Sequence, residues 1–283
     1  MILFKRRADL QNYLTVQRKK GQSLGFAPTM GALHQGHLSL IESSRKDNSI
    51  TICSIFINPA QFNDPGDFKK YPVTLEKDVY MLESAGCDVL FLPAIEEIYP
   101  NGTAGGMNYD LGYLETILEG KYRPGHFQGV CMAMHRLLDI VNPDNLYLGQ
   151  KDYQQCMVIK KLIEIIHQTG IIVNICPTLR EPDGLAMSSR NMRLNKEERE
   201  KAPAIYKTLQ YIKENLQNED LPVLKLIAAA KLNALGFKID YVEIADADSL
   251  QMMNKKDGKQ KLVALVAAFL NEVRLIDNLL LNE

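Results

Sequence analysis

Residues 22–57 read QSLGFAPTMGALHQGHLSLIESSRKDNSITICSIFI, and this stretch decides the fold. The short apolar run over 22–27, which ends at Pro28, predicts one buried strand, and the β-branched run over 50–57 predicts a second. A glycine-containing loop and a helix-like segment over 37–46 lie between them. Such a sequence of elements forms a right-handed βαβ unit by default, so we expect the two strands to be parallel.

Strands and helices continue to alternate beyond this unit. We expect helices over 74–86, 127–141 and 152–168, and strands over 88–92, 146–149 and 171–175. Alternation of this kind implies a parallel sheet with helices on both faces. The sequence therefore predicts an α/β fold for this part of the chain.

The character of the sequence changes after Arg180. The polar, turn-rich segment REPDGLAMSSRN leads into charged amphipathic helices around 196–217 and 222–235. Two strand-like segments follow, over 238–244 and 262–270, and they suit a small α+β domain better than an extension of the first sheet. We therefore place a domain boundary near 176, giving domains at 1–176 and 177–283.

Composition and charge exclude several classes of protein. The chain has 283 residues and is 46% apolar, so it can bury a sizeable core. Its formal net charge of -1 provides no overall attraction to nucleic acid, which is not an expected partner. No apolar stretch approaches the ~18 residues that suggest a membrane span. The opening MILFKRRADL has its apolar run before its basic residues, unlike a secretory signal, so we expect a cytoplasmic protein.

The five cysteines lie too far apart for a zinc knuckle or a redox pair. They stand at positions 53, 87, 131, 156 and 176, and their odd number argues against a disulfide framework. We expect buried thiols that pack as small apolar side chains.

The segment PTMGALHQGH, over 28–37, follows the first strand and opens a helix. Ligands of open parallel sheets sit at the carboxyl ends of strands, where a helix N-terminus favours phosphate. Gly31 and Gly36 would let the backbone approach closely, and His34 and His37 could point at one bound group. The alternatives are surface or capping histidines and a zinc site, for which no further ligands lie nearby.

Three other polar segments follow predicted strands. FINPAQF, over 56–62, offers the amides of Asn58 and Gln61 to a small polar ligand, although it also fits a plain turn. GQKDYQQ, over 149–155, offers Lys151 to phosphate, although Asp152 could simply cap the next helix. MSSRN, over 187–191, offers hydroxyls and a guanidinium that could clamp phosphate, although it also fits an ordinary polar loop.

The local chemistry of the remaining histidines is less informative. GKYRPGHFQG, over 120–129, predicts a shaped loop before a helix, and the roles of Arg123 and His126 cannot be assigned from it. His135 and His167 fall within helical patterns, where packing roles are the common ones.

These four motifs, in this order and at these separations, resemble those of the pantothenate synthetases over essentially the whole chain. The resemblance implies a Rossmann-like first domain related to the class I aminoacyl-tRNA synthetase group, with HQGH as its HxGH signature. It also implies a smaller C-terminal lid domain and a homodimer. The implied reaction joins pantoate to β-alanine with ATP through a pantoyl-adenylate, releasing AMP and pyrophosphate.

The resemblance also implies the residues of the site. His37 resembles the family's proton donor to the phosphates, while Gln61 and Gln155 would hold pantoate, with Gln61 also touching β-alanine. Asp78, in YPVTLEKD, is a candidate magnesium residue, directly or through water. The predicted catalytic residues are His34, His37, Lys151 and Arg190. The predicted ATP site consists of Met30, Gly31, His34, Gly36, His37, Gly149, Gln150, Lys151, Asp152, Leu179, Met187, Ser188, Ser189 and Arg190.

Two other functions remain open at this point. A nucleotidyltransferase that makes a dinucleotide or a dephospho-coenzyme would share the HxGH motif, but its phosphorylated acceptor would call for more cations than Gln61 and Gln155 provide. A non-catalytic nucleotide sensor would not need both histidines together with Lys151. Measurable turnover separates the sensor from the enzymes.

Overall fold

The computed structural model of the chain describes residues 1–62, 65–103, 107–256 and 258–282. It divides the chain into two compact units. The first comprises Met1–Gly149 and Val158–Cys176, and the second comprises Gln150–Met157 and Pro177–Glu283. The predicted single boundary near 176 places Gln150–Met157 in the first domain, whereas the structure groups this segment with the second unit. No helix in the described part of the chain is long and apolar enough to cross a membrane.

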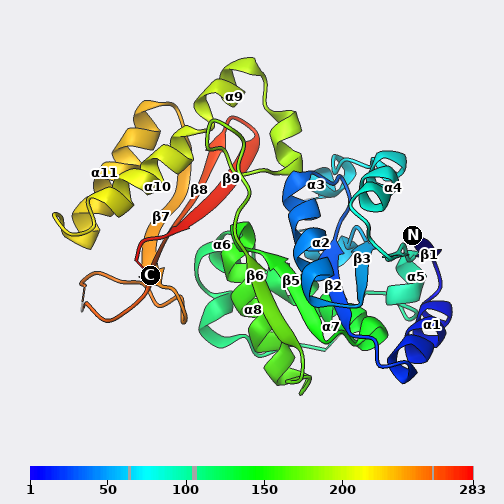
Figure 1. Cartoon of the computed structure of the whole chain (residues 1–283). Helices are drawn as coiled ribbons and strands as arrows, with labels where there is room; N and C mark the ends of the chain where they lie inside the picture. The colour runs from blue at the N-terminus through cyan, green and yellow to red at the C-terminus, as the bar shows by residue number, and fades with distance from the viewer. Residues whose placement is uncertain (63–64, 104–106, 257, 283) are drawn as a thin grey trace. The chain divides into compact units, whose positions relative to one another are not determined.

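The first unit contains a parallel sheet of six strands, in the order β1-β4-β3-β2-β5-β6. Every neighbouring pair is parallel, which confirms the predicted α/β fold. Helix α2 lies in front of strands β2 and β3 in Figure 1. The strands are β1 (Ile2–Phe4), β2 (Leu24–Thr29), β3 (Ile50–Ile55), β4 (Val89–Phe91), β5 (Asn145–Gly149) and β6 (Ile172–Cys176).

The helices of this unit pack their apolar side chains on the sheet. Leu38, Leu40 and Ile41 of α2 share a buried cluster with Leu82 of α4 and with residues of the central strands. All six residues of β3 are buried, as expected of a strand covered on both faces. The helices are α1 (Arg7–Lys19), α2 (Gln35–Asp47), α3 (Pro65–Lys69), α4 (Leu75–Ser84), α5 (Ile95–Ile98), α6 (Leu118–Tyr122) and α7 (His126–Val141), with α8 (Tyr153–Ile165) beginning in the second unit.

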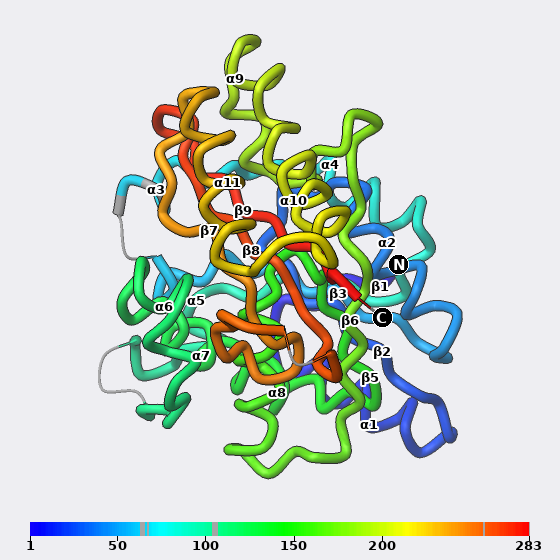
Figure 2. The backbone as a smooth tube through the Cα atoms, turned by 90° about the vertical axis from the view of Figure 1, so that its left-hand side faces the viewer, coloured from blue at the N-terminus to red at the C-terminus, as the bar shows by residue number. Residues whose placement is uncertain are grey.

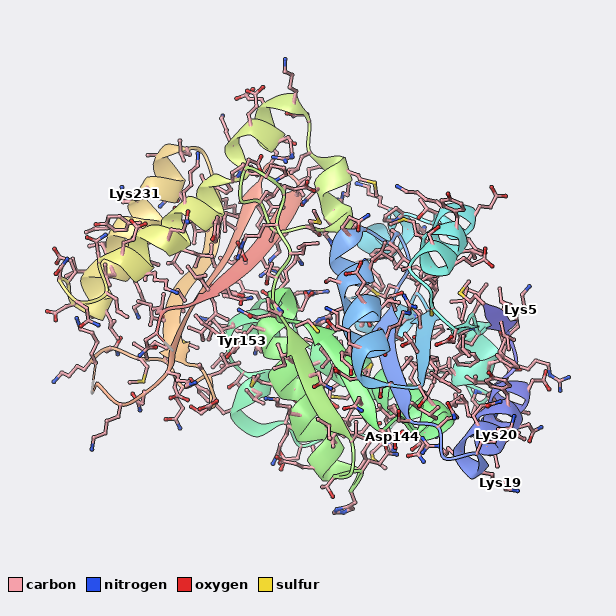
Figure 3. The ribbon with its side chains drawn as sticks, in the orientation of Figure 1. Lys5, Lys19, Lys20, Asp144, Tyr153 and Lys231 are labelled. Atoms are coloured by element: carbon pink, nitrogen blue, oxygen red, sulfur yellow. The ribbon has the colours of Figure 1, made fainter. Side chains whose placement is uncertain are left out.

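The order of the strands brings the carboxyl ends of β2, β3 and β5 to one edge of the sheet. The chain runs from β2 to β3 on one side and pairs β5 with β2 on the other, so the direction of winding changes between β2 and β5. Ligands of open α/β sheets bind at such a point, outside the carboxyl ends of the strands. The HxGH loop follows β2, FINPAQF follows β3, and GQKDYQQ follows β5. Asp144, labelled in Figure 3, lies at the opposite edge, where its Oδ2 accepts from Leu24 N at 2.7 Å.

The second unit packs two helices on an antiparallel sheet of three strands. Strands β7 (Lys238–Asp246), β8 (Leu262–Leu270) and β9 (Val273–Leu280) are paired in that order. Helices α10 (Ala204–Glu214) and α11 (Leu221–Ala234) bury leucine and isoleucine side chains against them, and Figure 2 shows both helices in front of the strands. Helix α9 (Lys196–Lys201) precedes α10. This confirms the predicted α+β character.

Several elements were not expected from the sequence, among them β1, α1 and β9. Strand β1 has only three residues, and α1 buries only Leu10 and Leu14, so neither carries a long apolar pattern. Strand β9 contains Asp277 and Asn278, which interrupt its apolar run. Both are nevertheless buried, with 4% and 2% of their surface exposed.

All five cysteines are buried, and none forms a disulfide in the described part of the chain. Burial raises the pKa of Cys87 and of Cys131 to about 12, which keeps these thiols protonated and unreactive at neutral pH. The predicted packing role of the cysteines is confirmed.

Candidate functional site

The HxGH loop is held in place by one buried carboxylate. Asp78, on the first turn of α4, accepts hydrogen bonds from Ala32 N at 2.9 Å and Leu33 N at 2.8 Å. Thr74 Oγ1 donates a third at 2.9 Å. These bonds pin the backbone between β2 and α2. Gly31 has φ +82, and a Cβ there would lie 3.1 Å from Asp78 Oδ2, so this position requires glycine.

The geometry around Asp78 does not fit the predicted magnesium role. Only 1% of its surface is exposed, and its two oxygens already accept three hydrogen bonds. Mg²⁺ keeps several waters in its coordination shell, and a buried carboxylate offers them no room. Among the described residues, no group of three or more His, Cys, Asp or Glu could hold a metal ion. We therefore assign Asp78 to the support of the loop.

Asp78→Asn is expected to lower the free energy of unfolding by about 2 kcal/mol in metal-free buffer, because an amide nitrogen would face a backbone N–H. Chemical denaturation measures this change. Glu76→Gln is the matched control, since Glu76 is exposed on the same turn of α4 and its replacement removes the same charge. Equal stability of the two variants would exclude the supporting role.

The structure brings the two histidines of the HxGH motif together. Their ring centroids lie 4.0 Å apart with an angle of 34° between the planes. His34 is the N-cap residue of α2, so the capping role considered for the motif does occur. His34 N donates to His37 Nδ1 at 3.4 Å. A backbone N–H can only donate, so Nδ1 accepts and the neutral ring carries its proton on Nε2. His37 therefore presents Nε2–H as a hydrogen-bond donor.

Gln61 lies beside the HxGH loop within the first unit. Its Nε2 donates to Met30 Sδ at 2.9 Å, and its Oε1 accepts from Asn58 Nδ2 at 3.0 Å. Asn58 is 2% exposed and also bonds Gly129 O, Ala60 N and Tyr99 Oη. The expectation that Asn58 offers its amide to a ligand is thus wrong, because the fold uses that amide to hold the short helix η1 (Pro59–Gln61).

Two residues of the segment over 120–129 form hydrogen bonds that hold the backbone of Gln61. Arg123 NH1 lies 3.1 Å from His126 Nε2, and His126 Nδ1 lies 2.8 Å from the Gln61 carbonyl oxygen. The guanidinium only donates, so Nε2 accepts and Nδ1–H donates to the carbonyl. Local sequence could not assign these two residues. The structure shows that they hold the backbone of Gln61.

The predicted site residues of the second unit lie in two segments. Gln150, Lys151 and Asp152 form the short helix η3, and Gln155 is half-buried at the start of α8. Lys151 Nζ lies 3.7 Å from Asp152 Oδ1, with 19% of the lysine side chain exposed. The distance is long for an ion pair, and the two residues are neighbours in the sequence.

The segment over 187–190 leads into a short helix, where the sequence predicted only a loop. Ser189–Arg193 form the 3-10 helix η4, and the Ser188 hydroxyl caps it by accepting from Arg190 N at 3.3 Å. Met187 N donates to Leu179 O at 3.0 Å, which brings these two predicted ATP residues together. Ser189 is buried, and 41% of Leu179 is exposed.

The structure thus groups the predicted residues within each unit. Met30, Gly31, His34, Gly36, His37, Gln61, Asp78 and Gly149 belong to the first unit. Gln150, Lys151, Asp152, Gln155, Leu179, Met187, Ser188, Ser189 and Arg190 belong to the second.

Sequence and structure comparisons agree on the relatives of this chain. A "Pantothenate synthetase" of Cytophaga hutchinsonii is 42% identical over 276 residues, covering 96% of each protein. Among solved structures, a pantothenate synthetase from Thermus thermophilus has a TM-score of 0.92 at 38% identity, with 100% of both chains covered. A pantoate-β-alanine ligase from Francisella tularensis, complexed with "Beta-gamma ATP" and β-alanine, has a TM-score of 0.81 at 39% identity, covering 99% and 97%.

The family model described as "Pantoate-beta-alanine ligase" matches residues 2–280 of the chain. This match includes both units and all four motifs. The chain therefore belongs to the pantoate-β-alanine ligase family.

Proposed function

We propose that this chain joins pantoate to β-alanine at the expense of ATP, through a pantoyl-adenylate. One observation of geometry carries the proposal. The loop pinned by Asp78 sets His34 and His37 at the N-terminus of α2, at the carboxyl edge of the parallel sheet. That position suits phosphate, because backbone N–H groups and the helix dipole both favour negative charge there. Family membership and the ligands of the Francisella tularensis structure support the same substrates.

In the proposed first step, a carboxylate oxygen of pantoate attacks the α-phosphorus of ATP, and the bond to the bridging oxygen breaks as pyrophosphate leaves. His37 donates its Nε2–H to a phosphate oxygen as charge develops. His34, Lys151 and Arg190 are the other residues predicted to take part in catalysis. In the second step, the amine of β-alanine attacks the acyl carbon and AMP leaves.

Each unit contributes one glutamine to the proposed binding of the substrates, Gln61 in the first unit and Gln155 in the second. Gln61 binds pantoate and β-alanine, and its amide is already oriented by Asn58. Gln155 binds pantoate, and the roles of the remaining predicted residues in binding ATP stay predictions. We expect Mg²⁺ to accompany ATP, but we assign no side chain to it. The homodimer and the cytoplasmic location stay predictions.

The test is the exchange of labelled pyrophosphate into ATP. Exchange should occur with pantoate and Mg²⁺ present and β-alanine absent, because the first step needs a carboxylate and no amine. β-Alanine should then convert the intermediate to pantothenate and AMP, and labelled oxygen from the pantoate carboxylate should appear in AMP.

Two outcomes would reject the proposal. Exchange that requires β-alanine, or AMP without the label, would rule out the adenylate. Exchange with nicotinate mononucleotide and none with pantoate would instead establish the nucleotidyltransferase function.

A further inference from the structure

Strand β9 carries two buried polar residues in succession, Asp277 and Asn278. They pair with Val266 and Leu265 of β8, in a sheet that is otherwise largely apolar. Successive residues of a strand point to opposite faces, so the two side chains serve different neighbours. A buried polar group is costly unless it is hydrogen-bonded, and the partners of this pair show what it holds.

Asn278 is bonded to the segment that follows β5. Its Nδ2 donates to the carbonyl oxygens of Gln150 and Lys151, both at 2.9 Å. Its Oδ1 accepts from Gln150 Nε2 at 3.1 Å. In a trans peptide the C=O and N–H point in opposite directions. The N–H groups of Lys151 and Asp152, which share peptides with these carbonyls, are therefore directed away from Asn278.

Asp277 is bonded to the base of the segment over 187–190. Arg180 donates to it through two nitrogens, NH1 to Oδ2 at 2.6 Å and NH2 to Oδ1 at 3.0 Å. Arg180 NH1 also donates to Gly184 O at 3.1 Å, and its guanidinium stacks on Tyr206 with a centroid distance of 3.8 Å. Arg180 and Ala186 form an antiparallel bridge directly before Met187. The ion pair therefore fixes the turn from which this segment starts.

We infer that Asp277 and Asn278 are positioning residues for ATP, which set the segments over 150–152 and 187–190 in register with one strand. The inference rests on the proposed function, since it takes these two segments as the part of the ATP site in the second unit. Neither residue needs to touch the ligand. Asn278 acts through Lys151, and Asp277 acts through Arg180 on Ser188, Ser189 and Arg190.

The test is a set of double-mutant cycles read as the Kd of ATP by calorimetry, which requires no turnover. Asn278→Ala should raise the Kd about tenfold, because Lys151 loses its anchored backbone. In the Lys151→Ala background the same change should add less than about twofold, because both substitutions act through one residue. Asp277→Asn should be additive with Lys151→Ala and non-additive with Arg190→Ala.

Asp240→Asn is the matched control. It breaks a different ion pair of this sheet, in which Arg274 Nε lies 2.7 Å from Asp240 Oδ2, and it should leave the Kd of ATP unchanged. Asn278→Ser keeps one donor and should show an intermediate Kd, which provides a readout if Asn278→Ala does not fold.

The inference is overturned if Asn278→Ala and Asn278→Ser bind ATP as the parent does, or if their effects are fully additive with Lys151→Ala. Failure of the proposed function is a separate result. A parent protein that binds ATP but exchanges no pyrophosphate with pantoate rejects the proposed reaction, while the cycles still decide the positioning role.

Discussion

His37→Ala is expected to slow the formation of the adenylate on the order of 10²-fold, which corresponds to about 2.7 kcal/mol of transition-state stabilisation. The bond from His34 N to His37 Nδ1 orients the ring and leaves Nε2–H as the donor. Charge on the phosphate oxygens grows as pyrophosphate leaves, so this donor matters more in the transition state than in the bound substrate. The affinity for ATP should therefore change little.

Single-turnover measurements with pantoate and ATP, in the absence of β-alanine, isolate this step. His37→Gln should recover part of the rate, because its amide keeps a donor. His167→Asn is the control, since His167 is exposed in the turn after α8 and has φ 57, a conformation that asparagine tolerates. A normal rate of adenylation in His37→Ala, or an equal loss in His167→Asn, would refute the role of His37.

Gly129→Ala is expected to lower the free energy of unfolding by about 3 kcal/mol and to weaken the binding of pantoate, because α7 packs directly on η1. A Cβ at this position would overlap the Ala60 carbonyl and lie 2.7 Å from Gln61 Cα. These neighbours are backbone atoms, which cannot rotate aside. The shift would also strain the bond from Asn58 Nδ2 to Gly129 O, now 2.9 Å.

Thermal unfolding and calorimetric titration with pantoate measure the two effects of Gly129→Ala. Gly170→Ala is the matched control, because no heavy atom lies within 4 Å of a Cβ built there and its φ is not in the left-handed region. The control should match the parent in both measurements. A Gly129→Ala variant with the melting temperature and the pantoate affinity of the parent would contradict the packing argument.

The predicted elements with long apolar patterns are the ones that the structure confirms. Strand β8 occupies Leu262–Leu270, the same bounds that the sequence predicts, because the run is apolar throughout. The predicted helix over 37–46 begins slightly earlier, at Gln35, since His34 rather than an apolar residue caps it. Strand β9 escaped prediction because the burial of Asp277 depends on Arg180, whose position no local pattern reveals.

Some of the candidate site residues could likewise be recognised from local sequence, and the role of others could not. The HxGH motif, Gln61 and Lys151 stand out because short polar segments with glycine or proline follow strands of a parallel sheet. Asp78 was predicted from the family resemblance to be a magnesium residue, whereas the structure shows it as a buried anchor of the backbone. The contacts with Ala32 N and Leu33 N, which join residues far apart in the chain, could not be recognised from local sequence.

The sequence by itself determined the alternation of strands and helices, the placement of the motifs after strands, and the family. Periodicity, turn residues and motif order are properties of neighbouring residues, so they can be recognised without a fold. The tertiary structure alone decided which side chains position the motifs. Asp78 is 46 residues from Ala32, His126 is 65 from Gln61, and Asn278 is 127 from Lys151. Such partners meet only when packing of the whole unit brings distant segments together, because the hydrogen bonds that join them have no counterpart in local sequence.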